Sequence, residues 1–353
     1  MTGISGNLGL RLLKLLGDFN VIGVDMVAPS KTEFPIRFER VDLGKESACR
    51  QLVQILKDSK ARAIVHLAFV IDPLRSGILD NERMWQINVA GTARVMEAIT
   101  EVNRHGGKVD TFIFPSSVSV YGPETYGPVT EDHPLSARSL PYALHKQEAD
   151  DVVRFRANSM DNCTSYVLRP HIFTGATMQN YLVGILRGTP TGKSLRAERM
   201  RRKGTRLPIM CPSKKFLENR WQFVHVDDMA RLLAHILKRP VTERNELVVL
   251  NVAGRGQPVT FEQAAHIANA KLLNVPGRWI MRILVQLAWS LGISGVPPDA
   301  LPYLIGSYTM DTTRLKKFLG DDYEKVIKYT IPDALADCFR EETPTKAGAA
   351  RTA

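Results

Sequence analysis

The stretch TGISGNLG, residues 2–9, places glycines at positions 3, 6 and 9. This T-G-x-x-G-x-x-G spacing is typical of the turn that holds a dinucleotide pyrophosphate, because glycines let the backbone approach the phosphates. A helix expected over residues 8–16 begins inside the turn and directs free N–H groups at the same place. The turn therefore predicts a dinucleotide site formed by Gly3, Ser5, Gly6, Asn7, Leu8 and Gly9.

A strand expected over residues 21–25, VIGVD, ends in Asp25. Its distance along the chain from Gly3 is close to the spacing at which an acidic side chain binds the adenosine ribose hydroxyls. Met26 follows Asp25, and no arginine stands there to receive a 2′-phosphate. The sequence therefore favours NAD over NADP.

The first 170 residues alternate short apolar runs with longer helical patterns. Strands that are apolar throughout are typical of a parallel sheet covered by crossover helices. The expected strands cover residues 21–25, 63–68, 111–117 and 165–170, and the expected helices cover 8–16, 46–57, 84–102 and 142–158. We predict an α/β fold, a Rossmann-type doubly wound parallel sheet in residues 1–170, to which strands near 221–226 and 246–252 return. Residues 171–340 are expected to form a smaller, mainly helical substrate region, and residues 341–353 a disordered tail.

No strand precedes the glycine turn. In a doubly wound sheet the first strand lies at the centre, so without it the neighbouring strands lose a row of backbone partners. We therefore expect the sequence to start late, with its first β-strand missing.

The composition is that of an ordinary globular protein, with 353 residues, 44% hydrophobic and 24% charged, and a net charge of +11. Between Arg187 and Lys215 there are ten lysines and arginines against one acid, Glu198. This basic stretch favours a solvated loop over contact with an anionic substrate, and either over a membrane or nucleic acid. No aromatic side chains interleave with it, so nucleic acid is not expected as a partner.

Four cysteines, Cys49, Cys163, Cys211 and Cys338, show no metal-ligand spacing. They indicate isolated thiols in a reducing compartment, which predicts a cytoplasmic protein without a bound metal. The apolar stretch 279–296 is interrupted by Arg282, Gln286 and Ser290, and it is too short and polar for a membrane span. It predicts an amphipathic helix that either covers a substrate pocket or docks on a bilayer surface.

The segment PYALHKQEAD, residues 141–150, carries Tyr142 and Lys146 four positions apart, on one face of a helix. A tyrosine hydroxyl with a pKa near ~10 is a poor base at neutral pH. A lysine ammonium and an oxidised nicotinamide beside it lower that pKa. Ser117, one crossover upstream, supplies a hydroxyl that orients a substrate oxygen. The three side chains predict proton transfer from an alcohol that is being oxidised.

Further motifs follow in order along residues 1–255: VDL (41–43), HLAF (66–69), NVAGT (88–92), SSVSVYG (116–122), LRP (168–170) and FVHVDDMA (223–230). With them the chain resembles the extended short-chain dehydrogenases/reductases, specifically the NAD-dependent epimerase/dehydratase family. The resemblance implies NAD as cofactor, Ser117, Tyr142 and Lys146 as the catalytic group, and a homodimer built on the helices that start near Met84 and Tyr142.

The same resemblance extends the cofactor site beyond the turn. Asp42 and Leu43 are implied near the adenine, and Leu67 and Ala68 along the cofactor channel. Asn88 belongs to the family's structural helix motif. We expect the cofactor-binding residues to include Asp42, Leu43, Leu67, Ala68, Asn88 and Pro170, together with Tyr142 and Lys146. The histidines His66, His145 and His225 are expected to be structural.

The reaction is less constrained. Sugar-nucleotide 4,6-dehydratases carry an Asp-Glu pair where this chain has Val118 and Ser119, so that elimination is not expected. Ile172 stands where UDP-sugar epimerases usually carry asparagine. The main expectation is an epimerase or dehydratase-type enzyme that transiently oxidises a hydroxyl of a sugar or sugar nucleotide. The alternative is an oxidoreductase of an apolar hydroxy or keto compound, like 3β-hydroxysteroid dehydrogenase or dihydroflavonol reductase. A second alternative is an NAD-binding sensor or scaffold without turnover.

Overall fold

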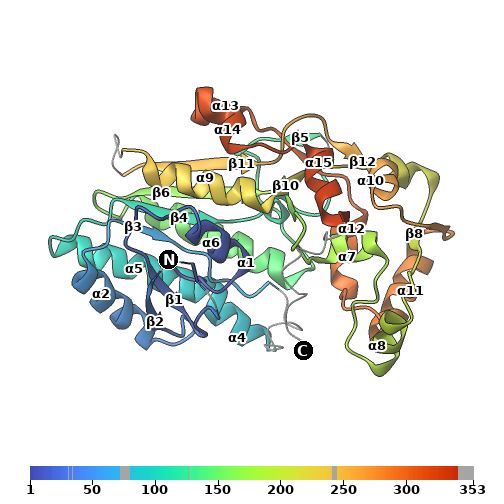
Figure 1. Ribbon diagram of the computed structural model, residues 1–353, viewed down its shortest axis with the longest axis horizontal. Coiled ribbons are helices and arrows are strands. Elements are labelled where there is room, and N and C mark those ends of the chain that lie inside the picture. The colour runs from blue at the N-terminus through green and yellow to red at the C-terminus, as the bar shows by residue number, and fades with distance from the viewer. Residues whose placement is uncertain (31, 34, 72–79, 126, 241–244, 341–353) are drawn as a thin grey trace, which may run out of the picture.

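The computed structural model describes residues 1–30, 32–33, 35–71, 80–125, 127–240 and 245–340. Its main sheet is parallel and runs in the order β11-β6-β4-β3, and a second parallel pair, β1-β2, lies beside β3 (Figure 1). The strands are β1 (Ile22–Asp25), β2 (Arg37–Arg40), β3 (Ala63–Val65), β4 (Thr111–Pro115), β6 (Thr164–Pro170) and β11 (Leu247–Val252). The Rossmann-type α/β prediction is confirmed by this order.

Met1 and Thr2 connect the two groups of strands. Thr2 forms parallel bridges to Val24 of β1 and to His66 just after β3. Val24 donates its N–H to the Met1 carbonyl at 2.8 Å, and Thr2 donates to the Val65 carbonyl at 3.0 Å. A cavity of about 800 Å³, lined by both strands, adjoins Met1. Thr2 thus lies between β1 and β3, and the expected absence of a first strand stays a prediction.

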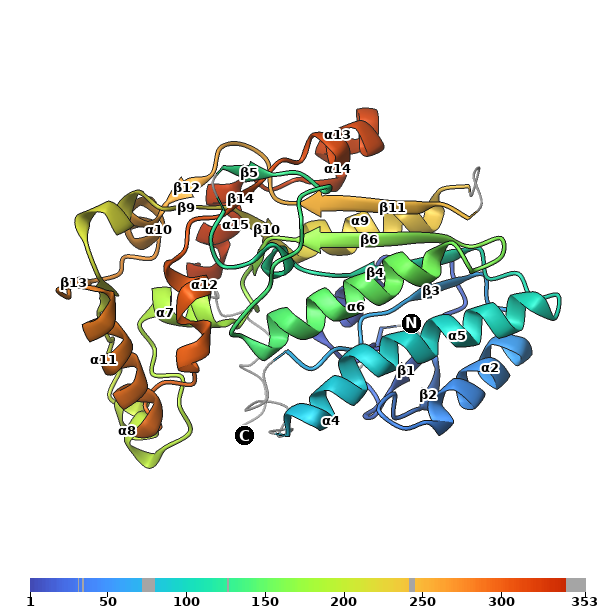
Figure 2. The ribbon, with the colours of Figure 1, turned by 180° about the vertical axis from the view of Figure 1, so that it is seen from behind.

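Helices cover both faces of the sheet (Figures 1 and 2). α2 (Ser47–Ser59), α5 (Gly91–Arg104) and α6 (Pro141–Ala157) lie on one face, and α1 (Asn7–Leu13) and α9 (Val226–Lys238) on the other. α5 buries Val95, Ile99 and Val102, spaced three and four residues apart, as one apolar face of a helix requires. Each helical layer has its own apolar core against the strands.

The chain leaves the sheet after β6 and builds a second, mainly helical region around the buried Trp221, Phe223 and Phe261. Its helices are α7 (Tyr181–Arg187), α8 (Leu195–Arg202), α10 (Phe261–Ile267), α11 (Arg278–Ser290), α12 (Leu301–Ile305) and α15 (Ile331–Ala336). Its two-stranded sheets pair β7 (Ile172–Thr174) with β10 (Phe223–His225), β8 (Ile209–Cys211) with β13 (Leu272–Asn274), and β9 (Arg220–Trp221) with β12 (Val259–Thr260). The remaining short elements are α4 (Asn81–Trp85), α13 (Thr313–Leu319), α14 (Tyr323–Val326), and the pair β5 (Pro128–Val129) and β14 (Thr309–Met310).

Several boundaries differ from those expected. The strand expected over 111–117 ends at Pro115, and Ser117 instead caps a 3-10 turn, η2 (Val118–Tyr121). The helix expected over 84–102 begins at Asn81 and passes through a π-helical turn, η1 (Gln86–Ala90). β11 joins the main sheet beside β6, whereas β10 pairs with β7 outside it. The expected tail at 341–353 lies outside the described residues.

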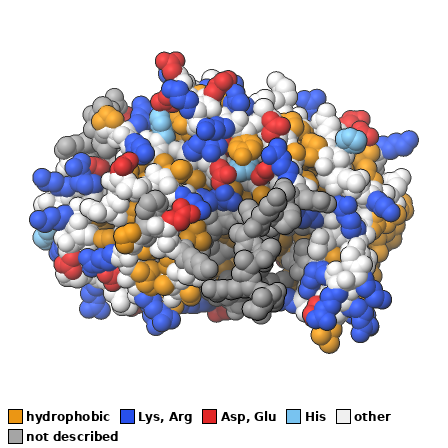
Figure 3. All heavy atoms as spheres, viewed as in Figure 1, with side chains coloured by type: hydrophobic (Ala, Val, Ile, Leu, Met, Phe, Trp, Pro, Cys, Tyr) orange, Lys and Arg blue, Asp and Glu red, His pale blue; other side chains and the backbone are white. Residues whose placement is uncertain are grey.

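The basic stretch includes α8, at the end of the helical region away from the sheet. Figure 3 shows lysine and arginine side chains gathered over that end. In the described part of the chain, no helix has the length and apolarity to cross a membrane.

Candidate active site

Ser117 and Tyr142 meet at the carboxyl edge of the sheet. Ser117 follows β4, and its Oγ accepts the N–H of Ser119 at 3.2 Å, which fixes the turn into η2. Tyr142 is the second residue of α6, just after Pro141 at the first helical position, where proline is favoured. The two side chains are close enough for the Ser117 hydroxyl to affect the pKa of Tyr142. Burial raises the pKa of Tyr142, and the Ser117 hydroxyl opposes that rise.

Lys146 lies one helical turn after Tyr142 and is buried. Its Nζ donates to the Pro115 carbonyl at 2.6 Å and lies 3.6 Å above the centre of the Phe69 ring. Burial lowers the pKa of Lys146 to about 7, against the opposing charge of Asp150. Lys146 is thus held against Pro115 and Phe69, one helical turn from Tyr142.

A buried ion pair joins β6 to α6, the helix that carries Tyr142 and Lys146. Arg169 of β6 donates to Asp150 of α6 through Nη2 at 2.8 Å and through Nε at 3.0 Å. Ser116 Oγ donates to the same carboxylate at 2.6 Å, and Arg169 also donates to the Tyr121 hydroxyl. Both partners of the pair are almost completely buried. The sequence analysis missed this pair; its signal was an arginine inside the otherwise apolar strand motif LRP.

The glycine turn packs tightly against the loop after β3. Gly3 has φ +69°, and a Cβ there would lie 2.5 Å from the backbone nitrogen of Ala68. A Cβ on Gly9 would lie 2.6 Å from the Ile4 carbonyl oxygen. Glycine is therefore required at both positions. The open backbone of this turn fits the dinucleotide pyrophosphate predicted from its spacing.

Asp25 lies next to the turn, as its position at the end of β1 predicts. One carboxylate oxygen accepts the Ser5 N–H at 3.1 Å, and the other accepts the Met26 N–H at 2.7 Å. At the start of α1, Asn7 Nδ2 donates to Thr177 Oγ1 at 3.0 Å, which ties the turn to the helical region. Asp25 thus adjoins the turn, and its contact with a ribose stays a prediction.

Other predicted cofactor residues have protein partners. Asp42 forms an ion pair with Arg83 and accepts the Gly44 N–H, while Leu43 is buried in the core.

Asn88 is fully buried in η1 and braces the loop after β3. Its side-chain amide accepts the N–H of Val70 and donates to the carbonyl of Val70. A π-helical turn of this kind is common at functional sites. Pro170, at the end of β6, is buried. The structure thus shows a bracing role for Asn88, and its contact with a cofactor stays a prediction.

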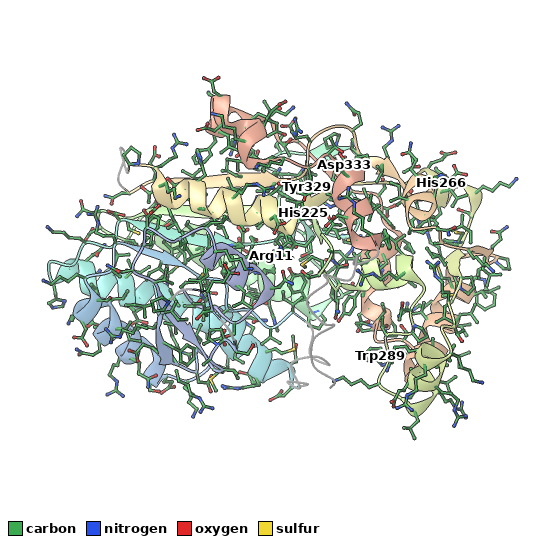
Figure 4. The ribbon with its side chains drawn as sticks, in the orientation of Figure 1. Arg11, His225, His266, Trp289, Tyr329 and Asp333 are labelled. Carbon is green, nitrogen blue, oxygen red and sulfur yellow. The ribbon has the colours of Figure 1, made fainter. Side chains whose placement is uncertain are left out.

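The three histidines are held by structural contacts. His66 bonds Thr2 Oγ1 and Thr92 Oγ1, and His145 lies 3.4 Å from Asn88 Nδ2. His225 stacks on Tyr329 with ring centres 3.8 Å apart and pairs with Asp337. Figure 4 shows His225 and Tyr329 together, near Arg11 of α1. Within the described ranges, no group of histidine, cysteine and acidic side chains is arranged to hold a metal ion.

Two buried histidines predict a loss of stability in mild acid. Burial lowers the pKa of His66 to about 3 and that of His171 to about 4. Unfolded histidines regain a pKa near ~6.5 and bind protons that the folded ones do not, so stability falls as pH drops below that value. Between about pH 7.5 and 5.5 we expect a loss of roughly 3 kcal/mol from the two together, measured by urea unfolding.

The matched comparison is His66→Gln/His171→Gln, which removes both titrating groups. The double variant should lose about 3 kcal/mol less than the parent across that pH interval, whatever its stability at pH 7.5. Equal pH slopes for parent and variant would show that other groups carry the dependence.

Comparison with known proteins agrees with this geometry. Residues 1–253 match the family model described as NAD dependent epimerase/dehydratase family. The UDP-glucose 4-epimerase of Homo sapiens is 26% identical over 141 residues, which are 40% of this chain and 38% of that protein. The Dictyostelium discoideum UDP-glucose 4-epimerase is 30% identical over 119 residues, 34% of this chain and 32% of that protein. The chain thus matches about a third of the length of these curated relatives.

Two solved structures share the whole fold. A Thermus thermophilus UDP-glucose 4-epimerase in complex with NAD has a TM-score of 0.63 at 19% identity, covering 97% of this chain and 98% of that one. A dTDP-glucose 4,6-dehydratase from Streptomyces venezuelae, with NAD bound, has a TM-score of 0.65 at 20% identity, covering 96% and 94%. With the family match over most of its length, the chain belongs to the NAD-dependent epimerase/dehydratase family.

Proposed function

We propose that this protein is an NAD-dependent enzyme that transiently oxidises a hydroxyl of a sugar or sugar nucleotide and reverses its configuration. The observation that carries the proposal is the neighbouring pair Ser117 and Tyr142, with Lys146 one turn further along α6. Family membership and the relatives that are UDP-glucose 4-epimerases support the same reaction class.

Each side chain has a role that its position suits. Ser117 holds the substrate oxygen, and Tyr142 accepts the hydroxyl proton at its phenolic oxygen. Burial raises the pKa of Tyr142. The Lys146 ammonium, together with an oxidised nicotinamide, would lower it and so oppose that rise. The proton returns from Tyr142 to the substrate oxygen when the carbonyl is reduced again.

The residues that would hold NAD are those of the glycine turn, Asp25 and Lys146. The turn would offer backbone N–H groups to the pyrophosphate, Asp25 would accept from the ribose hydroxyls, and Lys146 would bind the nicotinamide ribose. Bound NAD supplies a hydride acceptor that later returns the hydride, so no net reduced cofactor accumulates in an epimerisation.

An apolar cavity favours a second candidate, an oxidoreductase of an apolar hydroxy or keto compound. The cavity, of about 140 Å³, lies between α7, α11 and α12. Ile185 and Leu304 line it, and both also pack in the apolar cluster that Tyr142 joins. This candidate requires that a small apolar substrate reach from the cavity to Tyr142, which does not itself line it.

The two candidates differ in the fate of the hydride. Purified protein with NAD and UDP-galactose should produce UDP-glucose, measured by chromatography, without net reduced nicotinamide. Net reduced nicotinamide with a panel of apolar secondary alcohols, and no sugar-nucleotide turnover, would favour the second candidate. NAD binding without any turnover would leave the sensor or scaffold role and overturn the enzymatic proposal.

We also propose a homodimer through the exposed surfaces of α5 and α6. Phe155, on the outer face of α6, is 85% exposed, which suits a contact surface. Sedimentation should show a dimer at micromolar concentration, and a monomer would contradict it.

A further inference from the structure

α11 presents a row of apolar side chains to solvent. Met281 and Val285 are buried against the helical region, but Trp279 is 68% exposed and Leu287 53% exposed. The exposed residues form a row along one side of the helix, spaced four residues apart: Trp279, Ile283, Leu287 and Leu291. Figures 1 and 2 place α11 at the edge of the molecule far from the main sheet. The row lies on the side of α11 opposite Met281 and Val285, which line the apolar cavity described above.

The start of α8 continues this apolar surface. Gly192 donates its N–H to the Ile293 carbonyl, and Ser194 donates to the Gly292 carbonyl, so the chain before α8 is hydrogen-bonded to the chain after α11. Leu195, the first residue of α8, is 80% exposed. The exposed apolar residues of α11 and Leu195 therefore lie at one end of the molecule, which we call the α8–α11 end.

This end is strongly basic. Residues 187–215 and 264–298 together hold thirteen lysines and arginines and a single acid, Glu198, which is paired with Arg202. Their charge exceeds the net charge of +11 of the whole chain. Arg196 and Arg199 of α8 are exposed, as is Arg282 of α11. Figure 3 shows such cations around the tip that carries α8.

Exposed apolar side chains surrounded by cations match one partner best. An interfacial helix places its apolar row among lipid acyl chains while lysines and arginines contact the headgroup phosphates. A second copy of this chain would bring two positive ends together, and their repulsion opposes such pairing. We infer that the α8–α11 end docks on an anionic lipid bilayer, with α11 lying in the plane of the interface.

Vesicle binding tests this inference directly. The full chain is incubated with phosphatidylcholine vesicles that contain or lack roughly 30 mol% phosphatidylserine, in about 0.1 M salt, and sedimented. Binding is expected only to the anionic vesicles and should weaken as salt is raised. Tryptophan fluorescence should shift to the blue on binding, and Trp279→Phe should remove most of that shift.

Two sets of variants separate the apolar and charged contributions. Leu287→Glu should weaken binding at least tenfold, whereas Leu15→Glu, at an exposed leucine of the NAD-binding side, should stay within about twofold. Removal of three cations from α8 should weaken binding about 100-fold, and removal of three from α2 and the turn before it should change it little. The α8 set is Arg196→Ala, Arg199→Ala and Arg202→Ala, and the control set is Lys45→Ala, Arg50→Ala and Lys57→Ala.

Circular dichroism and thermal unfolding verify that each variant is folded. The inference would be overturned if the folded parent chain does not bind the anionic vesicles. It would also be overturned if the variants of the α8–α11 end and the control variants lose vesicle binding equally. A change of oligomeric state in Leu287→Glu without vesicle binding by the parent would mean instead that a second copy covers the row.

Discussion

Tyr142→Phe is expected to lower turnover about 10³-fold while leaving the fold and NAD binding unchanged. The substitution removes only the phenolic oxygen, which is the proposed proton acceptor, and keeps the ring in its edge contact with Phe69. Rates follow from initial velocities with saturating substrate, and NAD binding from calorimetry. Loss through the proton-transfer step should appear in kcat rather than in KM.

Tyr166→Phe is the matched control. Tyr166 lies on β6 and packs against Phe318, on the far side of the sheet from α6, so its hydroxyl has no proposed chemical role. It should turn over at the parental rate. If Tyr142→Phe turns over as fast as this control, Tyr142 has no part in proton transfer. If Tyr142→Phe instead loses NAD binding, the role of Tyr142 is to bind the cofactor.

Asp150→Ala should lower the free energy of unfolding by about 3–5 kcal/mol. The substitution leaves the Arg169 guanidinium, 1% exposed, without its bidentate partner and leaves Ser116 without its acceptor. A buried charge that loses its partner keeps its full desolvation cost. Urea unfolding followed by circular dichroism measures the change.

An exposed ion pair on the same helix provides the comparison. Asp151 Oδ1 lies 3.5 Å from Arg154 Nη1, and both side chains are about half exposed. Asp151→Ala should therefore lower the free energy of unfolding by less than about 1 kcal/mol. Asp150→Leu/Arg169→Leu removes both buried charges and should recover part of the stability lost by Asp150→Ala. Equal effects of Asp150→Ala and Asp151→Ala would show that the buried pair does not stabilise the fold.

Residue spacing along the chain predicted the parts of the site that lie within one helix or at the end of one strand. Tyr142 and Lys146 share a helix face because of their spacing, and Asp25 lies beside the turn because β1 ends there. Both follow from the periods of helix and strand.

Contacts between distant elements could not be predicted in this way. Arg169 and Asp150 meet only because β6 and α6 pack together, and a single sequence contains no sign of that pairing beyond an isolated charge in an apolar strand. The same holds for Asn88, whose amide bonds a loop 18 residues away in the chain. The basic stretch predicts a solvated loop, and its composition alone does not reveal that the chain before α8 is hydrogen-bonded to the chain after α11.

The glycine turn is bonded to both groups of strands. Gly3 donates its N–H to the Val24 carbonyl of β1, and Thr2 donates to the Val65 carbonyl of β3. Asp25, at the end of β1, accepts the Ser5 N–H. A dinucleotide that spans the turn and Asp25 would therefore restrain the turn, β1 and β3 together, so that part of its binding free energy would go into ordering the protein that holds it.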